Sequence, residues 1–105
     1  MNLRIMKHIT NKAELDQLLS TNKKVVVDFY ANWCGPCKIL GPIFEEVAQD
    51  KKDWTFVKVD VDQANEISSE YEIRSIPTVI FFQDGKMADK RIGFIPKNEL
   101  KELLK

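Results

Sequence analysis

The chain has 105 residues, of which 44% are hydrophobic and 30% charged, the composition of a globular protein rather than of a disordered or fibrous one. Its length predicts a single domain, residues 1–105, with a core large enough to fold without metal or disulfide staples. Sixteen basic and sixteen acidic residues give a net charge of zero. A neutral chain lacks the basic surface that nucleic acid or an anionic membrane binds, so neither partner is expected.

The first half of the chain alternates predicted strands and helices. Residues 5–9 are a weak candidate strand, and Asn11 with Glu14 three positions later has the spacing of a helix start. Residues 25–30 are almost continuously apolar, which predicts a strand covered on both faces. From Ile39 to Ala48 apolar side chains recur at helical spacing, with Pro42 inside the pattern, where it should kink the helix.

The second half adds the remaining elements. Residues 54–61 predict a strand, residues 65–71 a short helix, and residues 78–82 a strand that ends in the turn Asp84-Gly85. Residues 86–92 should be its antiparallel partner, and Pro96 can start a last helix. The order βαβαβαββα predicts an α/β fold, with a central mixed sheet of mostly parallel core plus a C-terminal antiparallel hairpin, flanked by helices on both faces.

Membrane and export signals are not found in the sequence. No apolar run approaches the roughly 18 residues that span a bilayer. The first eight residues include charged side chains and lead directly into the first predicted strand, which is not the pattern of a secretory signal. We therefore expect a cytoplasmic protein.

Cys34 and Cys37 enclose Gly35 and Pro36 at the point where a buried strand gives way to a helix. The start of a helix carries unpaired N–H groups and the positive end of the helix dipole, so it stabilises a thiolate. Pro36 presets the backbone of the first turn, and Gly35 lets the turn bring the sulfurs together. We interpret Cys34, before the helix and more exposed, as the nucleophile and Cys37, shielded in the first turn, as the resolving thiol.

Two other roles for the cysteine pair fit the sequence less well. A structural zinc site needs four ligands, usually Cys or His, and beyond the two cysteines the chain offers only His8 on a predicted edge strand. An inert buried pair has no need of Gly-Pro at a helix start. We therefore expect no metal site.

Residues 30–38, with the sequence YANWCGPCK, closely resemble the active-site segment of the thioredoxin family. The similarity runs in order from about Val25 to the end of the chain and includes Val27-Asp28-Phe29, Pro42, Lys58-Val59-Asp60, Ile76-Pro77-Thr78, Gly85 and Gly93. The resemblance implies the thioredoxin fold and a thiol–disulfide oxidoreductase that reduces protein disulfides and is left with a Cys34–Cys37 disulfide.

The same resemblance implies partners and cofactors. A thioredoxin reductase would return the disulfide to the dithiol, so NADPH and flavin would belong to that partner and none would be bound to this chain. We expect a monomer whose other partners are disulfide-containing proteins.

Asp28 and Lys58 each interrupt an apolar strand. Burial raises the pKa of a carboxyl group, and in the thioredoxin family the matching Asp accepts and donates the proton of the second cysteine. The resemblance therefore implies a catalytic role for Asp28, with Lys58 as its partner. From burial alone, Asp28 could instead be a hydrogen-bonded residue at a strand end, and Lys58 a lysine that extends to solvent.

The other candidate site residues surround the cysteines. The resemblance implies a cis peptide bond between Ile76 and Pro77, packed against the cysteine pair, where the Ile76 backbone could pair with an extended substrate. Tyr30, together with Trp33, Ile76 and Gly93, would form an apolar rim, although both aromatic residues could instead belong to the core. The residues expected to bind substrate are Trp33, Gly35, Pro36, Ile76, Pro77 and Gly93.

Three positions depart from the family pattern: Tyr30, where Trp is frequent, Gly41, where Ala is usual, and Phe94, where a small residue is common. They bear on the shape of the rim and on partner choice.

Two other functions remain open. One is an oxidase or isomerase module of the disulfide isomerase type, which usually carries a His where this chain has Gly35-Pro36. The other is a binding module in which the cysteines are incidental.

Overall fold

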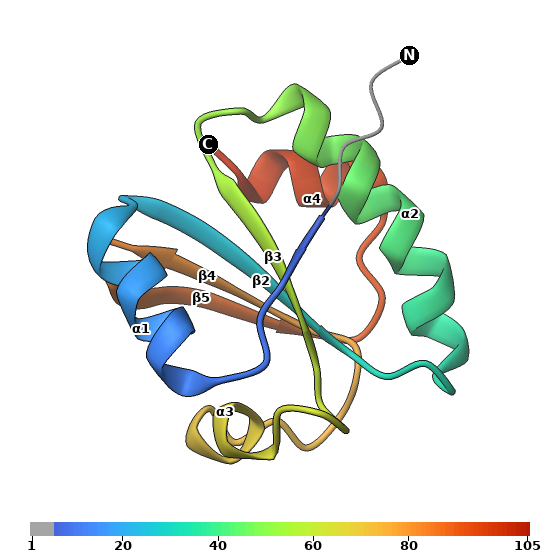
Figure 1. Ribbon diagram of the computed structural model, residues 1–105. Coiled ribbons are helices and arrows are strands. Elements are labelled where there is room, and N and C mark those ends of the chain that lie inside the picture. Colours follow the sequence, from blue (N-terminus) through green and yellow to red (C-terminus); the bar gives the residue numbers. More distant parts are fainter. Residues whose placement is uncertain (1–5) are drawn as a thin grey trace.

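The computed structural model describes residues 6–105 and confirms the order βαβαβαββα (Figure 1). The strands are β1 (Lys7–His8), β2 (Lys24–Tyr30), β3 (Thr55–Asp60), β4 (Thr78–Gln83) and β5 (Lys86–Ile92). The helices are α1 (Lys12–Thr21), α2 (Gly35–Asp50), α3 (Asn65–Glu70) and α4 (Lys97–Leu103). β1 is shorter than the expected strand, and Ile5 at the start of that prediction lies outside the described residues.

The strands form one mixed sheet in the order β1-β3-β2-β4-β5. β3 runs parallel to both β1 and β2, whereas β4 runs antiparallel to both β2 and β5. The expected parallel core is thus β1-β3-β2, and the hairpin joins it through β2. The hairpin turn lies at Asp84 and Gly85, with φ of 53° and 81°, which matches the left-handed conformation of a tight two-residue turn. β2 is therefore the central strand.

Side chains of β2 alternate between two hydrophobic cores, because successive residues of a strand point to opposite faces. Val25, Val27 and Phe29 pack in a core that includes residues of α1 and α3, whereas Val26 packs with α2 and α4. The two pairs of helices lie on different sides of the sheet (Figure 1), as expected. By the same alternation Asp28 lies on the face covered by α2.

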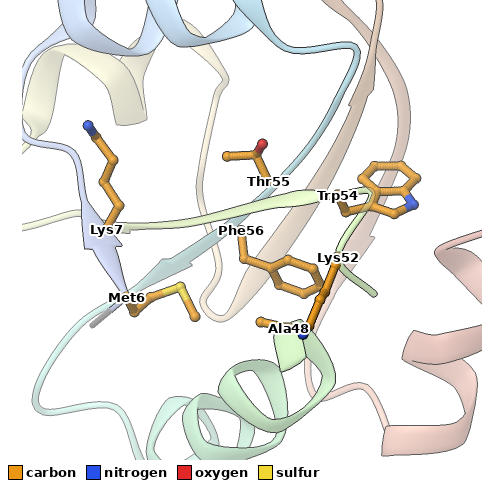
Figure 2. A pocket seen from close by; sticks show the side chains of 7 residues that line it. All are labelled: Met6, Lys7, Ala48, Lys52, Trp54, Thr55 and Phe56. Carbon is orange, nitrogen blue, oxygen red and sulfur yellow. The ribbon is translucent and has the colours of Figure 1, made fainter. Parts of the chain in front are cut away.

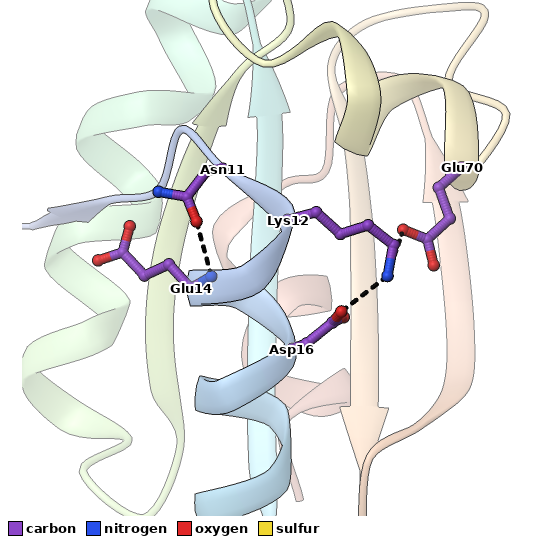
Figure 3. Close-up of polar contacts among 5 residues, drawn as sticks. All are labelled: Asn11, Lys12, Glu14, Asp16 and Glu70. Atoms are coloured by element: carbon purple, nitrogen blue, oxygen red, sulfur yellow. Dashed lines mark hydrogen bonds and ion pairs between the residues drawn. The ribbon is translucent and has the colours of Figure 1, made fainter.

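Helix α1 begins at the predicted cap. Asn11 Oδ1 accepts the backbone N–H of Glu14 at 2.8 Å (Figure 3). The Lys12 ammonium donates to the Asp16 carboxylate at 2.7 Å and lies 3.5 Å from the Glu70 carboxylate of α3. The cap fixes where α1 starts, and Lys12 connects the two helices that cover the same face of the sheet.

Helix α2 buries most of the predicted apolar stripe. Leu40, Phe44 and Val47 are fully buried, but Ile39 is 61% exposed and does not belong to the core. The helix continues through Pro42 to Asp50. Among residues 6–105, no helix is both long enough and apolar enough to cross a membrane.

Candidate active site

The cysteine pair lies where the central strand β2 passes into α2. Cys34 is the N-cap residue of α2, and Cys37 lies in its first turn. The two residues form a disulfide with Cα atoms 5.2 Å apart, and the Cys37 backbone N–H donates to Cys34 Sγ at 3.2 Å. Pro36 stands at the helix start, where a missing N–H leaves no hydrogen bond unmade. The predicted local geometry of the motif is therefore confirmed.

The expected difference in exposure between the cysteines is wrong, because each residue is 5% exposed in this disulfide form. Cys34 Sγ lies 3.7 Å from the carbonyl oxygen of Ile76, and the pair packs with Ala31 and Tyr30. These neighbours cover Cys34 although it precedes the helix. The two cysteines still differ in position. Cys34, at the N-cap of α2, accepts a hydrogen bond from a backbone N–H through its sulfur, whereas Cys37 lies within the helix.

The chain facing the cysteines comes from the β4–β5 side of the sheet. The Ile76–Pro77 peptide bond is cis, as the family resemblance implied. The carbonyl of Pro77 accepts the Gly93 N–H at 2.8 Å. Gly93 has a φ of 98°, a conformation that favours glycine, and a Cβ atom there would meet nothing within 4 Å. The surface at Gly93 is therefore open beside the segment that contacts Cys34.

Trp33 is 68% exposed, so its alternative interpretation as a core residue is wrong. Its indole N–H donates to the Asp62 carboxylate at 2.9 Å, which holds the ring at the surface one residue before Cys34. Ile92 and Phe94, on either side of Gly93, are also exposed. Large apolar side chains thus remain uncovered on two segments that border the cysteine pair.

Asp28 lies on β2 beneath α2 and is fully buried. Among the described residues neither of its carboxyl oxygens has a hydrogen-bond partner, so the alternative of a hydrogen-bonded strand-end residue is wrong. Burial raises the pKa of this carboxyl from 3.8 to about 7, because water no longer solvates the anion. The positive charge of Lys58 lowers the pKa, and the negative charge of Glu45 raises it.

Lys58 stands opposite Asp28 in the parallel register of β2 and β3, and it is only 9% exposed, so it is not a lysine that extends to solvent. The charge of Lys58 acts on the Asp28 carboxyl, but the described residues contain no ion pair between the two within 4.0 Å. Within the described chain the ion pair of the Lys58 ammonium is with Glu45 of α2, at 4.0 Å, and its Nζ lies 4.5 Å from the centre of the Tyr30 ring. Glu45 is not among the predicted site residues, because its helical spacing places it on the solvent side of α2.

The thioredoxin family model matches residues 6–105. The chain belongs to the thioredoxin family. It is 39% identical over 100 residues to thioredoxin of Mycoplasma pneumoniae, covering 95% of this chain and 98% of that relative. It is 42% identical over 96 residues to thioredoxin of Rickettsia bellii, covering 90% and 91%. The solved structure of Plasmodium falciparum thioredoxin has a TM-score of 0.89 at 38% identity, covering 94% of this chain and 96% of that one.

Family membership and the Cys34–Cys37 disulfide together define the activity. This thioredoxin-family chain is a protein-disulfide oxidoreductase that works by exchange between a dithiol and a disulfide. In residues 6–105 no group of three or more His, Cys, Asp or Glu side chains is placed to hold a metal ion.

A cavity away from the cysteine pair has no residues for disulfide chemistry. It has a volume of about 230 Å³ and lies near the end of α2, between Met6, Ala48, Trp54 and Phe56 (Figure 2). Ala48 is fourteen residues along the helix axis from Cys34, or about 20 Å. The lining of this cavity includes Lys7 and Lys52 but no cysteine or carboxylate. The cysteine pair at the other end of α2 is therefore the active-site candidate.

Proposed function

We propose that this chain reduces disulfide bonds of protein substrates, with Cys34 as the attacking thiolate and Cys37 as the resolving thiol. The observation that carries this assignment is the position of Cys34 at the N-cap of α2, where its sulfur accepts the Cys37 N–H. Backbone N–H groups and the helix dipole stabilise a negative charge at that point, and a thiolate is the form that attacks a disulfide.

The reaction transfers two electrons from the chain to the substrate. The Cys34 thiolate attacks one sulfur of the substrate disulfide, a bond forms between them, and the other substrate sulfur leaves as a thiolate that takes a proton from solvent. The sulfur of Cys37, after losing its proton, attacks Cys34 and releases the second substrate sulfur. The substrate ends as two thiols, and Cys34 and Cys37 end as the disulfide.

Asp28 is the group that accepts the proton of Cys37 in this proposal. Its pKa of about 7 supports the role, because the carboxyl can both take up and release a proton at neutral pH. Lys58, its neighbour across the β2–β3 register, influences the charge of Asp28. Without an acceptor for the Cys37 proton, the second step would be slow.

Substrate binding uses the surface around the disulfide. The exposed indole of Trp33 and the open positions of Gly35 and Gly93 support contact with a polypeptide that approaches closely. Ile76, with its carbonyl 3.7 Å from Cys34 Sγ, offers backbone groups for strand-like pairing. The residues that we propose to bind substrate are Trp33, Gly35, Pro36, Ile76, Pro77 and Gly93.

The chain acts as a monomer of one domain in the cytoplasm, and a thioredoxin reductase returns its disulfide to the dithiol in this proposal. NADPH and flavin then belong to the reductase. The apolar surface beside Cys34 supports docking of both a reductase and a substrate, because each must bring a sulfur to the same atom.

Reduction of insulin disulfides, driven by dithiothreitol, tests the roles of the two cysteines. Cys34→Ser and Cys37→Ser should each abolish turnover. Only Cys37→Ser should accumulate a mixed disulfide with substrate, because it can attack but cannot resolve. Trapping of substrate on Cys37 in the Cys34→Ser variant would reverse the two roles, and full biological activity of the double variant would favour a binding module.

A further inference from the structure

A cavity of about 230 Å³ opens beside the cysteine pair, between the first half of α2 and the ends of β2 and β3. Its lining includes Tyr30, Cys37, Gly41, Glu45 and Lys58. It therefore joins the resolving cysteine to an ion pair that the catalytic scheme above does not use. The two charged groups of that pair differ in their surroundings, since the Lys58 side chain is 11% exposed and the Glu45 side chain 51%.

The Lys58 ammonium is held on the α2 side of this cavity. Its Nζ is 4.0 Å from Glu45 Oε2 and 4.5 Å from the centre of the Tyr30 ring. A Cβ atom at Gly41 would lie 3.4 Å from the same Nζ, so the ammonium lies beside the position of that glycine on α2. One contact from α2 and one from β2 thus define its position, close to Gly41.

Asp28 is the other carboxylate within the influence of this ammonium. It stands opposite Lys58 in register, yet it forms no ion pair with it within 4.0 Å in the described chain, and both its oxygens are buried without a hydrogen-bond partner there. On its other side the facing residue is Val79 of β4, which is apolar. The titratable or charged groups that share this face of the sheet or line the cavity are Tyr30, Cys37, Lys38, Glu45, Lys58 and Asp60.

We propose that Glu45 is a positioning residue, which holds the Lys58 ammonium at the cavity beside Gly41 and away from Asp28, so that Asp28 remains free to take the proton of Cys37. This rests on the proposed function, because it assigns a purpose to keeping Asp28 without a direct ion pair. An ammonium that moved onto Asp28 would stabilise its carboxylate and weaken it as a base.

The variant Glu45→Gln tests this role. It removes the negative charge and leaves a side chain of the same length on an exposed position, so the fold is retained. Asp28 should then titrate about one pH unit lower in the oxidised protein, followed by the ¹³C shift of its carboxyl carbon. The acid limb of the pH profile of turnover should move in the same direction. Glu46→Gln, one position along the helix and paired with Lys97 instead, is the matched control and should change neither curve.

The same substitution made in a Lys58→Met protein separates two ways in which Glu45 can change the Asp28 titration: by positioning Lys58, or directly by its own charge. Removal of the Glu45 charge lowers the pKa of Asp28 through space even if Lys58 does not move. In a Lys58→Met protein the positioning role predicts that Glu45→Gln shifts the Asp28 titration by less than half of its effect in the wild type. An equal shift in both backgrounds, or no shift in either, would overturn the proposal.

The titration of Asp28 is measured without catalysis. The positioning role of Glu45 and the catalytic role of Asp28 can therefore be disproved independently of each other. If Asp28→Asn turns over as fast as the wild type at pH 7, Asp28 is not the base, and the catalytic purpose assigned to Glu45 is wrong. If Asp28→Asn is slow but Glu45→Gln leaves the Asp28 titration unchanged, the base assignment stands and the positioning role is wrong.

Discussion

The two faces of the central sheet are built from the same strands but contain different chemistry. On the α1 and α3 side, β2 contributes Val25, Val27 and Phe29 to a core of apolar side chains. On the α2 side the same strand contributes Val26 and then Asp28, buried opposite Lys58. Burying a charge or an unpaired polar group costs free energy. The second face therefore contributes less to the free energy of unfolding than the first.

That difference shows how the fold separates stability from function. The apolar face fixes the strand positions, and the polar face uses this rigid frame to hold a carboxyl group at a raised pKa. A change on the first face should therefore alter stability with little pH dependence. A change on the second face should alter pH dependence and, at neutral pH, can increase stability.

The largest expected effect is on the apolar face. Phe29→Ala removes a fully buried ring that packs 6.2 Å from the Tyr71 ring, and it should lower the free energy of unfolding by about 3–5 kcal/mol. Urea denaturation of the oxidised protein measures this loss. Met87→Ala, at a 47% exposed strand position, is the control and should stay within about 0.5 kcal/mol of the wild type. A loss below about 1 kcal/mol for Phe29→Ala would show that this face does not dominate stability.

The second prediction concerns Asp28→Asn on the polar face. Asp28 binds its proton more tightly in the folded chain, with a pKa of about 7, than in the unfolded chain, with a pKa of 3.8. Stability is therefore highest below the unfolded value and falls as pH rises to about 7, by about 1.4 kcal/mol per pH unit and roughly 4 kcal/mol in total.

Asparagine carries no charge, so the variant avoids this loss, but its buried amide remains unpaired at a cost of about 1–3 kcal/mol. We expect a net gain of roughly 1–3 kcal/mol at pH 8, and no gain at pH 3.5. Denaturation curves of the oxidised protein at the two pH values measure it. Equal differences at both values would contradict the buried, neutral state of Asp28 in acid.

A smaller effect is expected for Gly41→Ala, at the departure from the family pattern inside α2. Alanine is favoured over glycine in a helix by about 1 kcal/mol. The new Cβ would lie 3.4 Å from Lys58 Nζ, the end of a flexible side chain that can yield. Thermal unfolding should show a gain of up to about 1 kcal/mol. A loss instead would mean that Lys58 is held too firmly to move.

A similarly small effect is expected at Glu72, after α3. Its φ of 53° is left-handed, which costs a residue with a side chain about 1–2 kcal/mol. Glu72→Gly relieves this, but it also adds about 0.4–1 kcal/mol of freedom to the unfolded chain. The net gain in unfolding free energy should therefore be below about 1.5 kcal/mol at neutral pH. A measurable loss would show that the Glu72 side chain makes a stabilising contact.

The sequence by itself determined the order of the elements, the two-sided burial of β2 and the start of α2 at the cysteines. These features follow from local rules: the spacing of apolar residues, turn residues such as Asp84-Gly85, and the missing N–H of Pro36. The resemblance to a family supplied the cis bond before Pro77, which no local rule predicts.

Only the tertiary structure decided how the charges and sulfurs are surrounded. Equal burial of Cys34 and Cys37 depends on Ile76, which is 42 residues from Cys34 in sequence. The ion pair of Lys58 is with Glu45 of α2, although Lys58 stands opposite Asp28 in the sheet and its charge lowers the pKa of that carboxyl. Such contacts depend on how elements distant in sequence pack together, and the spacing of residues along the chain does not contain that information.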